Sequence, residues 1–276
     1  MFTIEVLDGE IVWERTTKER THGDRQLLTA PDNCHDNAFR LIKVCMFSQF
    51  GQELFVLEIL NNLHGGFFLD SGASDGVKSS NTKLLEESFG WKGICIEPNE
   101  DFFAALVKNR HCHCINCCLY DRDGNVDFLE KAYTLGGILD EYHPAHLQYA
   151  QQSFNLASNA DGNPATVSKP ARTIRSVFRE CEAPAVIDYW SLDTEGSELA
   201  ILKSFPFDEY TFRVLTVEHN WLPVRHEINA FLESRGYLRV ASLGIDDCYV
   251  KGMSLPRSFW RSHVWSGARL RRGMSV

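Results

Sequence analysis

The sequence predicts an α/β fold, a three-layer αβα sandwich around a mostly parallel sheet. From residue 66 onward, short apolar runs alternate with amphipathic segments, which is typical of βαβ units. A glycine-containing turn, GASDG at 72–76, directly follows the first apolar run, FFLD. The last two apolar runs, LRVASLG and DDCYVKG, are separated only by the turn at 244–246, so we expect them to pair antiparallel at the end of the sheet.

The first elements follow in order along the chain. Residues 1–50 are predicted to form an N-terminal extension, in which FTIEVLDGEIVW predicts a hairpin around Asp8 and Gly9. Residues 36–63 have helix-like apolar spacing. Strands and helices then alternate over five segments, FFLD, NTKLLEESFG, GICIEP, EDFFAALVKNR and CHCINCCLY. The last of these segments falls where the third strand of the sheet is expected.

The alternation stops between Asp121 and Pro170. Here NVDFLEKA predicts an added strand, and NLASNADGNPATVSKP is a polar stretch rich in Gly, Asn and Pro, as mobile lids and binding loops are. We therefore predict a lid-like insertion at 131–170 within a main domain at 51–252. The alternation resumes with TIRSVFREC, AVIDYWSLDTEG, SELAILKSF, FRVLTVEHN and HEINAFLESRG, and a basic, aromatic tail at 253–276 ends the chain.

Composition narrows the class of protein. A net charge of −9 argues against a broad surface for nucleic acid or anionic membrane, and 44% hydrophobic residues suffice for a sizeable core. The N-terminus does not resemble a secretory signal, and no apolar run reaches membrane-spanning length. Nine cysteines without a small-scaffold pattern fit a reducing compartment, so we expect a cytoplasmic protein. In the tail, we expect aromatic side chains to pack on the domain rather than bind nucleic acid.

The turn at 72–76 also matches GxSxG, the nucleophile elbow of serine hydrolases, and His64-Gly65-Gly66 imitates their oxyanion-hole motif. A hydrolase takes its oxyanion donor from a separate, earlier loop, and its acid and histidine follow the serine. Here the two motifs flank one predicted strand, and a single strand cannot place both of its ends at one oxyanion. The sequence therefore favours a turn that holds a cofactor over a nucleophilic Ser74.

Acids near this turn indicate which cofactor it holds. Asp70 and Asp75 would repel the phosphates of a dinucleotide, whereas the ammonium and sulfonium groups of S-adenosylmethionine suit them. The next strand ends in Glu97, about where βαβ units place a ribose-binding acid. NAD could use the same acid, so Glu97 alone does not separate the two cofactors. An exposed acid at a strand end is the structural alternative.

The residues also resemble a known family. FFLDSGASDG, followed in order by SSNT, GWKGICIEPN, KNR, DYWSLDTEGSELAILKSF and LTVEHN, is similar to the FkbM family of S-adenosylmethionine-dependent methyltransferases, over about 48–252 without much of 131–170. The resemblance implies a class I methyltransferase fold, which is Rossmann-like, with a seven-stranded sheet whose last strand is antiparallel. It implies that the turn surrounds the methionine part of the cofactor. The amides at the start of the following helix would bind the cofactor carboxylate.

Together, position and resemblance predict one cofactor-binding set. Cys118 and Leu119 are expected to border the adenine end of the cofactor. The full set is Asp70, Gly72, Ala73, Ser74, Asp75, Gly76, Ser79, Asn81, Thr82, Glu97, Pro98, Cys118, Leu119 and Asp193.

Catalytic candidates lie at two further strand ends. Asp193 and Glu195, in the segment DTEG, follow a central strand, and polar residues there face the ligand crevice of open α/β sheets. The alternative is that Glu195 or Glu198 merely caps the next helix. His219, at the end of FRVLTVEHN, is a candidate base for an alcohol or amide substrate, and it could also be a structural histidine.

We predict no metal site. The segment HCHCINCC at 111–118 has no second ligand knuckle, and residues along a strand alternate faces, so buried small cysteines explain it better than zinc. Magnesium at Asp193 and Glu195 is a second possibility, because carboxylates at a methyl-transfer site can bind it. No spacing in the sequence demands a metal there.

These features predict a methyltransferase that uses S-adenosylmethionine. We expect it to methylate a hydroxyl of a sugar or secondary metabolite in natural product biosynthesis. One alternative is N-methylation of an amide or amine, including a peptide side chain, and another is a regulatory protein that has lost turnover. Selectivity is expected to reside at 1–50, 131–170 and 253–276. The sequence predicts a small-molecule or peptide substrate and leaves the oligomeric state open.

Overall fold

A computed structural model of the chain describes residues 2–7, 10–15, 47–157 and 164–252. The chain divides into two compact units, residues 1–46 and residues 47–276. In the first unit, β1 (Phe2–Leu7) and β2 (Glu10–Arg15) pair antiparallel with Phe2 opposite Arg15, which confirms the predicted hairpin. The predicted tail at 253–276 and the rest of the extension up to residue 46 lie outside the described residues.

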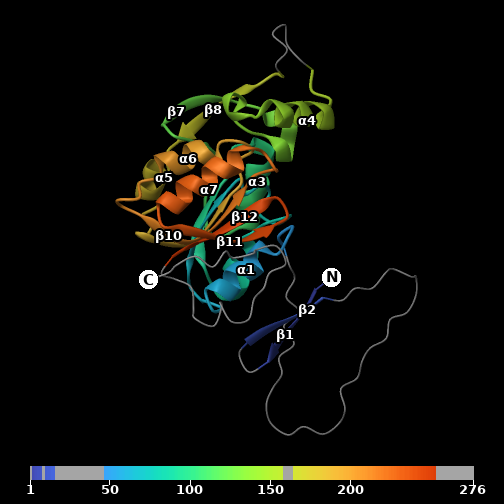
Figure 1. Ribbon diagram of the computed structural model, residues 1–276. Helices are drawn as coiled ribbons and strands as arrows, with labels where there is room; N and C mark the ends of the chain where they lie inside the picture. The colour runs from blue at the N-terminus through green and yellow to red at the C-terminus, as the bar shows by residue number, and fades with distance from the viewer. Residues whose placement is uncertain (1, 8–9, 16–46, 158–163, 253–276) are drawn as a thin grey trace, which may run out of the picture. The chain divides into compact units, whose positions relative to one another are not determined.

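Within the described part of the second unit, seven strands form the central sheet in the order β11-β12-β10-β9-β3-β4-β5 (Figure 1). β12 pairs antiparallel with both of its neighbours, whereas the other pairs are parallel, as the sequence predicts for a class I methyltransferase fold. The strands are β3 (Phe67–Ser71), β4 (Lys92–Ile96), β5 (His113–Ile115), β9 (Val186–Leu192), β10 (Thr211–Glu218), β11 (Tyr237–Leu243) and β12 (Asp246–Lys251).

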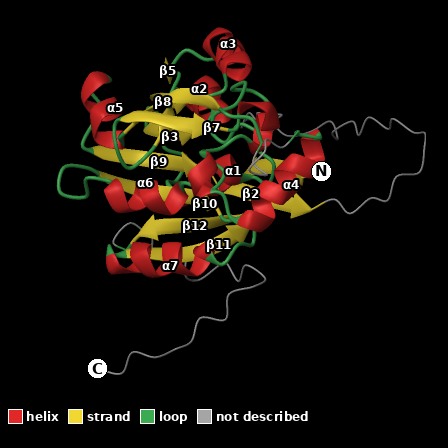
Figure 2. Cartoon of the chain, turned by 90° about the horizontal axis from the view of Figure 1, so that it is seen from above, coloured by secondary structure: helices red, strands yellow, loops and turns green. Residues whose placement is uncertain are grey.

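Helices cover both faces of this sheet. In Figure 1, α5, α6 and α7 lie above the sheet and α1 lies below it, and Figure 2 looks down onto the face of the sheet, where its strands lie side by side. The core of the upper layer packs Trp190 and Leu215 of the sheet against Phe178 of α5 and Leu202 of α6, all nearly inaccessible to solvent. The helices are α1 (Gln52–Ile59), α2 (Lys83–Phe89), α3 (Glu100–Asn109), α5 (Ile174–Glu180), α6 (Glu198–Ser204) and α7 (Val224–Ser234).

A second, smaller sheet interrupts the alternation. It has the order β6-β8-β7 and is formed by β6 (Cys118–Leu119), β7 (Gly124–Phe128) and β8 (Val167–Arg172). Between β7 and β8 the chain forms the 3-10 helices η1 (Glu130–Leu135) and η2 (Leu139–Glu141), and then α4 (Pro144–Phe154). The stretch 131–170, predicted as a lid-like insertion, therefore carries most of η1, all of η2 and α4, and the start of β8.

The segment CHCINCCLY does not form one strand. It is divided into β5 of the central sheet and β6 of the small sheet. The break has a local cause, because the Asn116 side-chain amide donates to the carbonyl oxygens of Glu97 and Pro98, at 2.8 and 3.2 Å. These bonds hold the chain beside the end of β4 and send it toward the small sheet.

Side-chain caps define where several helices begin. Oδ1 of Asn99 accepts hydrogen bonds from the Asp101 and Phe102 amides at the start of α3, and Oγ1 of Thr173 accepts one from the Ser176 amide in α5. α4 begins with Pro144 in its first turn, behind a cap by the His143 ring. Among the helices of the described residues, none has the length and apolar character needed to cross a membrane.

Candidate cofactor and substrate site

A pocket of about 660 Å³ lies at the carboxyl ends of β3, β4, β9 and β10. The chain leaves β3 toward β4 and β5 in one direction, and β9 leads to β10 in the other, so the order of the sheet reverses between β3 and β9. Open α/β sheets bind ligands at such a switch point, beyond the carboxyl ends of the strands. The volume is in the range of sites for small ligands.

The glycine turn after β3 forms one wall of the pocket. Gly72 has a φ of +86°, and a Cβ atom added there would lie 1.8 Å from the backbone oxygen of Asp193. Ser74 has a φ of +50°, which side-chain-bearing residues adopt uncommonly. The turn thus packs directly against the segment that follows β9, and it brings Ala73 and Ser74 to the pocket.

Two residues of the same turn stabilise it from outside the pocket lining. Oδ1 of Asp75 accepts hydrogen bonds from the Val77 and Lys78 amides, at 2.9 and 2.8 Å. Gly76 packs against Leu106, which would lie 2.6 Å from an added Cβ atom. Asp75 and Gly76 were predicted to surround the cofactor, and neither is among the described residues that line the pocket.

Glu97 stands at the carboxyl end of β4 and is 6% exposed. Its Oε2 accepts a hydrogen bond from the Ser74 amide and its Oε1 one from the Asn99 amide, both at 2.8 Å. Burial raises its pKa to about 7, although the two amides favour the ionised form. These bonds fix a carboxylate in the pocket wall, where the sequence predicts a ribose-binding acid.

Asp70 also lines the pocket and is supported from behind. Its Oδ2 accepts a hydrogen bond from the Thr82 hydroxyl at 2.5 Å, and that hydroxyl accepts one from the Arg110 guanidinium at 2.9 Å. Burial raises the pKa of Asp70, and the nearby Arg110 charge opposes this shift. Thr82 is therefore a supporting residue, because it is not among the described residues that line the pocket.

Asn81 offers a hydrogen-bond acceptor in the pocket wall. Its Nδ2 donates to the Ser191 hydroxyl at 2.9 Å, while its buried Oδ1 has no hydrogen-bond partner within the described part of the chain. An unused acceptor oxygen beside several carboxylates suits a ligand with an ammonium group, as S-adenosylmethionine has. Other predicted cofactor residues that line the same pocket are Ser79, Pro98, Cys118 and Leu119.

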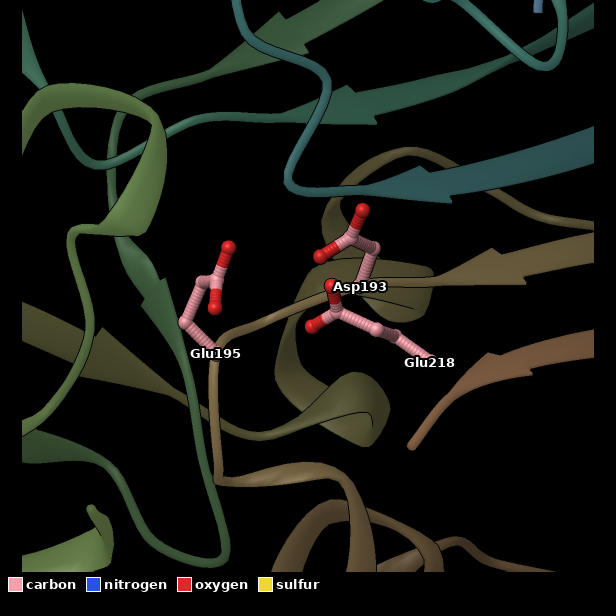
Figure 3. Close-up of side chains that lie close together, drawn as sticks. All are labelled: Asp193, Glu195 and Glu218. Carbon is pink, nitrogen blue, oxygen red and sulfur yellow. The ribbon is translucent and has the colours of Figure 1, made fainter. Parts of the chain in front are cut away.

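Three carboxylates meet at the other end of the pocket (Figure 3). Asp193 and Glu195 follow β9, and Glu218 ends β10; one oxygen of each lies within 4.8 Å of the others. Asp246 lies opposite Glu218 in the β10–β12 register, and its Oδ2 accepts a hydrogen bond from the Gln52 amide at 2.5 Å. This end of the pocket thus has four acids, of which the sequence predicted Asp193 and Glu195.

Burial and mutual repulsion raise the pKa values of these acids. Burial is the larger cause in each case, and it raises the pKa of Glu195 to about 8 and that of Asp246 to about 6. The pKa values of Asp193 and Glu218 are also raised, first by burial and then by neighbouring carboxylates. Carboxylates at this spacing can share protons or a cation. The net charge of these acids therefore depends on what is bound.

Glu195, in the segment DTEG, and Glu198, just after it, have different roles. Glu198 accepts hydrogen bonds from the Thr194 and Gly196 amides, at 2.8 and 3.1 Å, and so stabilises the turn that precedes α6. Glu195 has a φ of +59° and lines the pocket instead. Its Oε2 lies 2.6 Å from Nε2 of His146 on α4 and 3.4 Å from Nδ2 of Asn220.

The structure corrects the predicted place of His219. Its Nδ1 accepts a hydrogen bond from the Trp221 amide at 3.0 Å, its Nε2 lies 3.8 Å from Oδ1 of Asp247, and it is not among the described residues that line the pocket. The reason is the alternation of side chains along an extended chain, which sends Glu218 to the pocket and the next residue away. The histidine in the pocket is His146.

Sequence reasoning missed several pocket residues. Glu218 directly precedes His219, and alternation along β10 was the signal that could have found it. The sequence indicated Asp246 more weakly, as an acid at the start of the strand that we expected to pair antiparallel. No pattern in the sequence indicated His146 or the η1 segment, since residues of the insertion reach the pocket only through tertiary packing. That part of the lining comprises Tyr133, Thr134, Leu135, Gly136, Gly137, Ile138, Ala145, His146 and Tyr149.

The hydrolase alternative is not supported by the topology. His64-Gly65-Gly66 precede the amino end of β3, and Ser74 follows its carboxyl end.

The cysteine segment lacks ligand geometry, because the described residues bring three possible metal ligands together at Asp193, Glu195 and Glu218 rather than at 111–118. Cys117 and Cys118 are buried, and the cysteines within the described ranges are not disulfide-bonded.

Comparisons with known proteins identify a family and two similar structures. Residues 70–239, more than half of the chain, match the model of the methyltransferase FkbM domain. A precorrin-6y C5,15-methyltransferase from Geobacter metallireducens GS-15 is 10% identical with a TM-score of 0.37, over 72% of this chain and 85% of that chain. A methyltransferase from Pyrococcus furiosus is 13% identical with a TM-score of 0.36, over 72% and 81%. No curated protein gives a significant match.

The family match spans the glycine turn, Glu97, the DTEG segment and Glu218, all of which contribute residues to the pocket lining. The chain belongs to the FkbM family of S-adenosylmethionine-dependent methyltransferases.

Proposed function

We propose that this enzyme transfers a methyl group from S-adenosylmethionine to a hydroxyl oxygen of a sugar or of a secondary metabolite. The cofactor supplies an electrophilic methyl group on a sulfonium sulfur. Glu97 would accept hydrogen bonds from the ribose hydroxyls, and Asn81 with Asp70 would receive the ammonium group. Cys118 and Leu119 would then border the adenine ring, as their place in the pocket lining allows.

The observation that supports a hydroxyl substrate is the acidic end of the pocket. Asp193, Glu195, Glu218 and Asp246 line it, and their raised pKa values mean that some of them carry protons near neutral pH. Such a group both donates hydrogen bonds to hydroxyls and accepts them. An amine would be held there as ammonium, which has no lone pair for attack on the methyl carbon. A hydroxyl keeps its lone pairs in the same surroundings.

Aromatic side chains of the insertion fit a ring-shaped substrate. Tyr133 and Tyr149 line the pocket and are 45% and 59% exposed. An exposed aromatic face packs against the apolar face of a sugar or of a polycyclic metabolite, while the acids bind its hydroxyls. An amide nitrogen of a peptide natural product is the second candidate, since an amide is not protonated by the acidic end.

The test combines binding and turnover. Calorimetry should first detect S-adenosylmethionine binding by the full chain. Methyl-labelled cofactor is then incubated with methyl glycosides, polyhydroxylated phenols and N-acetylated peptides, and the products are characterised by NMR. We expect O-methyl products. N-methyl products would favour the second candidate, and binding without any product would favour a regulatory protein.

A further inference from the structure

His146 is the histidine that the insertion brings to the acidic end of the pocket. It lies in the first turns of α4, is 8% exposed and lines the pocket together with Glu195. Its Nε2 lies 2.6 Å from Oε2 of Glu195, so one proton is held between the two atoms. The contact joins residues 49 positions apart, from the insertion and from the central sheet.

The ring of His146 is held in place from several sides. Tyr142 stacks on it at a centroid distance of 5.6 Å and an interplanar angle of 19°, and Tyr149 lies 6.4 Å away. Asn220 contributes a second contact to Oε2 of Glu195 at 3.4 Å. Nε2 contacts the carboxylate of Glu195, so this contact leaves the other ring nitrogen, Nδ1, unused. This is the arrangement in which a carboxylate orients an imidazole that takes up a proton.

The surroundings set the charge of the pair. Burial lowers the pKa of His146, and it raises the pKa of Glu195 to about 8. Burial therefore favours the uncharged form of each group. The other titratable groups around the two residues are Glu198, Asp193, Glu218, Tyr142 and Tyr149.

We propose that His146 and Glu195 act as one general base, in which the imidazole takes the proton of the substrate hydroxyl and the carboxylate orients and stabilises it. This inference rests on the proposed function. As the hydroxyl oxygen bonds to the methyl carbon, the carbon–sulfur electron pair returns to sulfur and the hydroxyl proton moves to the imidazole. General base catalysis of this kind contributes about 10²- to 10⁴-fold to a rate.

NMR on the full chain provides a test that does not depend on turnover. The ring signals of His146 in histidine-labelled protein are assigned by their loss in His146→Gln, and their titration is followed with and without S-adenosylmethionine. We expect Glu195→Gln to shift the apparent pKa of His146 by about one unit, because the pair titrates as a unit. Identical titrations in wild type and Glu195→Gln would show that the pair does not exist.

Kinetics tests the role of the pair, with a substrate that the wild type methylates. His146→Gln, Glu195→Gln and the double variant should each lose about 100-fold in kcat, since residues that act as a unit are not additive. Losses that multiply would show two independent roles. The loss should shrink for phenols that ionise below the assay pH, because these need no base.

A matched control is His226→Gln, which removes an exposed histidine on α7 outside the pocket lining. It should leave kcat, KM and the pH profile unchanged. Circular dichroism and calorimetry on each variant should show an intact fold and S-adenosylmethionine affinity within about threefold of wild type, because neither residue belongs to the predicted cofactor-binding set. A wild type without cofactor binding would refute the proposed function, and unchanged kinetics of His146→Gln would refute this inference alone.

Discussion

Glu97 shows how a single side chain is prepared to bind a ligand. Two backbone amides hold its carboxylate, yet burial keeps its pKa near 7. Only the ionised form accepts hydrogen bonds from both ribose hydroxyls, so protonation weakens binding. Cofactor affinity should therefore rise as the pH increases from 6 to 8.

Replacing Glu97→Gln should weaken S-adenosylmethionine binding by about 10- to 100-fold, equivalent to about 1–3 kcal/mol, because a charge-assisted hydrogen-bond pair is lost. It should also remove the pH dependence of the affinity between pH 6 and 8. Calorimetry at several pH values measures both effects. Asp101→Asn, which changes an exposed acid on α3, is the control and should bind as wild type does. If the affinity changes neither with pH nor on substitution of Glu97, then Glu97 does not belong to the ribose site.

The sequence predicted pocket residues best where a strand end and a turn coincide. Asp70, Ser74, Glu97 and Asp193 all line the pocket because the carboxyl ends of parallel strands meet at one edge. The prediction that His219 lies in the pocket failed, because successive side chains along an extended chain point in opposite directions. No pattern of residues within the insertion could reveal the contact of His146 with Glu195, since that contact depends on how α4 packs.

At the scale of elements, the turn after β3 and the segment after β9 are built against each other. Ser71 and Asp193 are linked by a backbone hydrogen bond of 3.1 Å, and Gly72 leaves no room for a side chain beside Asp193. The cofactor wall and the acidic end of the pocket therefore share one rigid junction. A change that displaces one segment should displace the other.

Gly72→Ala should lower the free energy of unfolding by about 2–4 kcal/mol, since a positive φ and a backbone clash both oppose the added methyl group. Chemical denaturation measures this loss. Gly90→Ala is the matched control, because Gly90 has a φ of +66° but no atom within 4 Å of an added Cβ. It should lose only about 1 kcal/mol. Equal losses in the two variants would mean that the junction contributes nothing to stability.

Most elements of the central sheet were predictable because their apolar runs alternate regularly with helices. The antiparallel pairing of the last two strands followed from the shortness of the turn between them. The division of CHCINCCLY into β5 and β6 did not follow, because it depends on Asn116 reaching the carbonyl groups at the end of β4. The pattern of apolar residues does not reveal a hydrogen bond between a side chain and a backbone group distant in sequence.

For the whole molecule, the concentration of acids in one pocket has a thermodynamic effect. An acid whose pKa is raised on folding keeps its proton in the folded state after the unfolded chain has lost it. Stability then falls as the pH rises from the unfolded pKa, near 4.5, to the folded one. For Glu97 and Glu195 the fall extends to pH values of about 7 and 8. His146 and His219, with lowered pKa values, act in the opposite sense only below about pH 6.5.

The cofactor-free protein should therefore lose about 2–4 °C in Tm between pH 6.5 and 8.5, the equivalent of about 1 kcal/mol. Glu218→Gln should reduce this loss, because it removes one of three mutually repelling carboxylates. Differential scanning calorimetry across this pH range measures the effect. Glu227→Gln, at an exposed position of α7, should follow the wild-type curve. A Tm that rises over this interval would contradict the assignment of raised pKa values to the pocket acids.

The reversed direction of β12 also bears on how this enzyme could acquire new specificities. Because β12 runs antiparallel to β10 and starts where β10 ends, the tight connection before it brings Ile245 and Asp246 to the pocket. In the proposed site the methyl donor is held mainly by residues at the ends of β3 and β4, and neither strand is a neighbour of β12 in the sheet. Mutation in a few residues of a hairpin can thus alter what is methylated while the donor cradle stays intact.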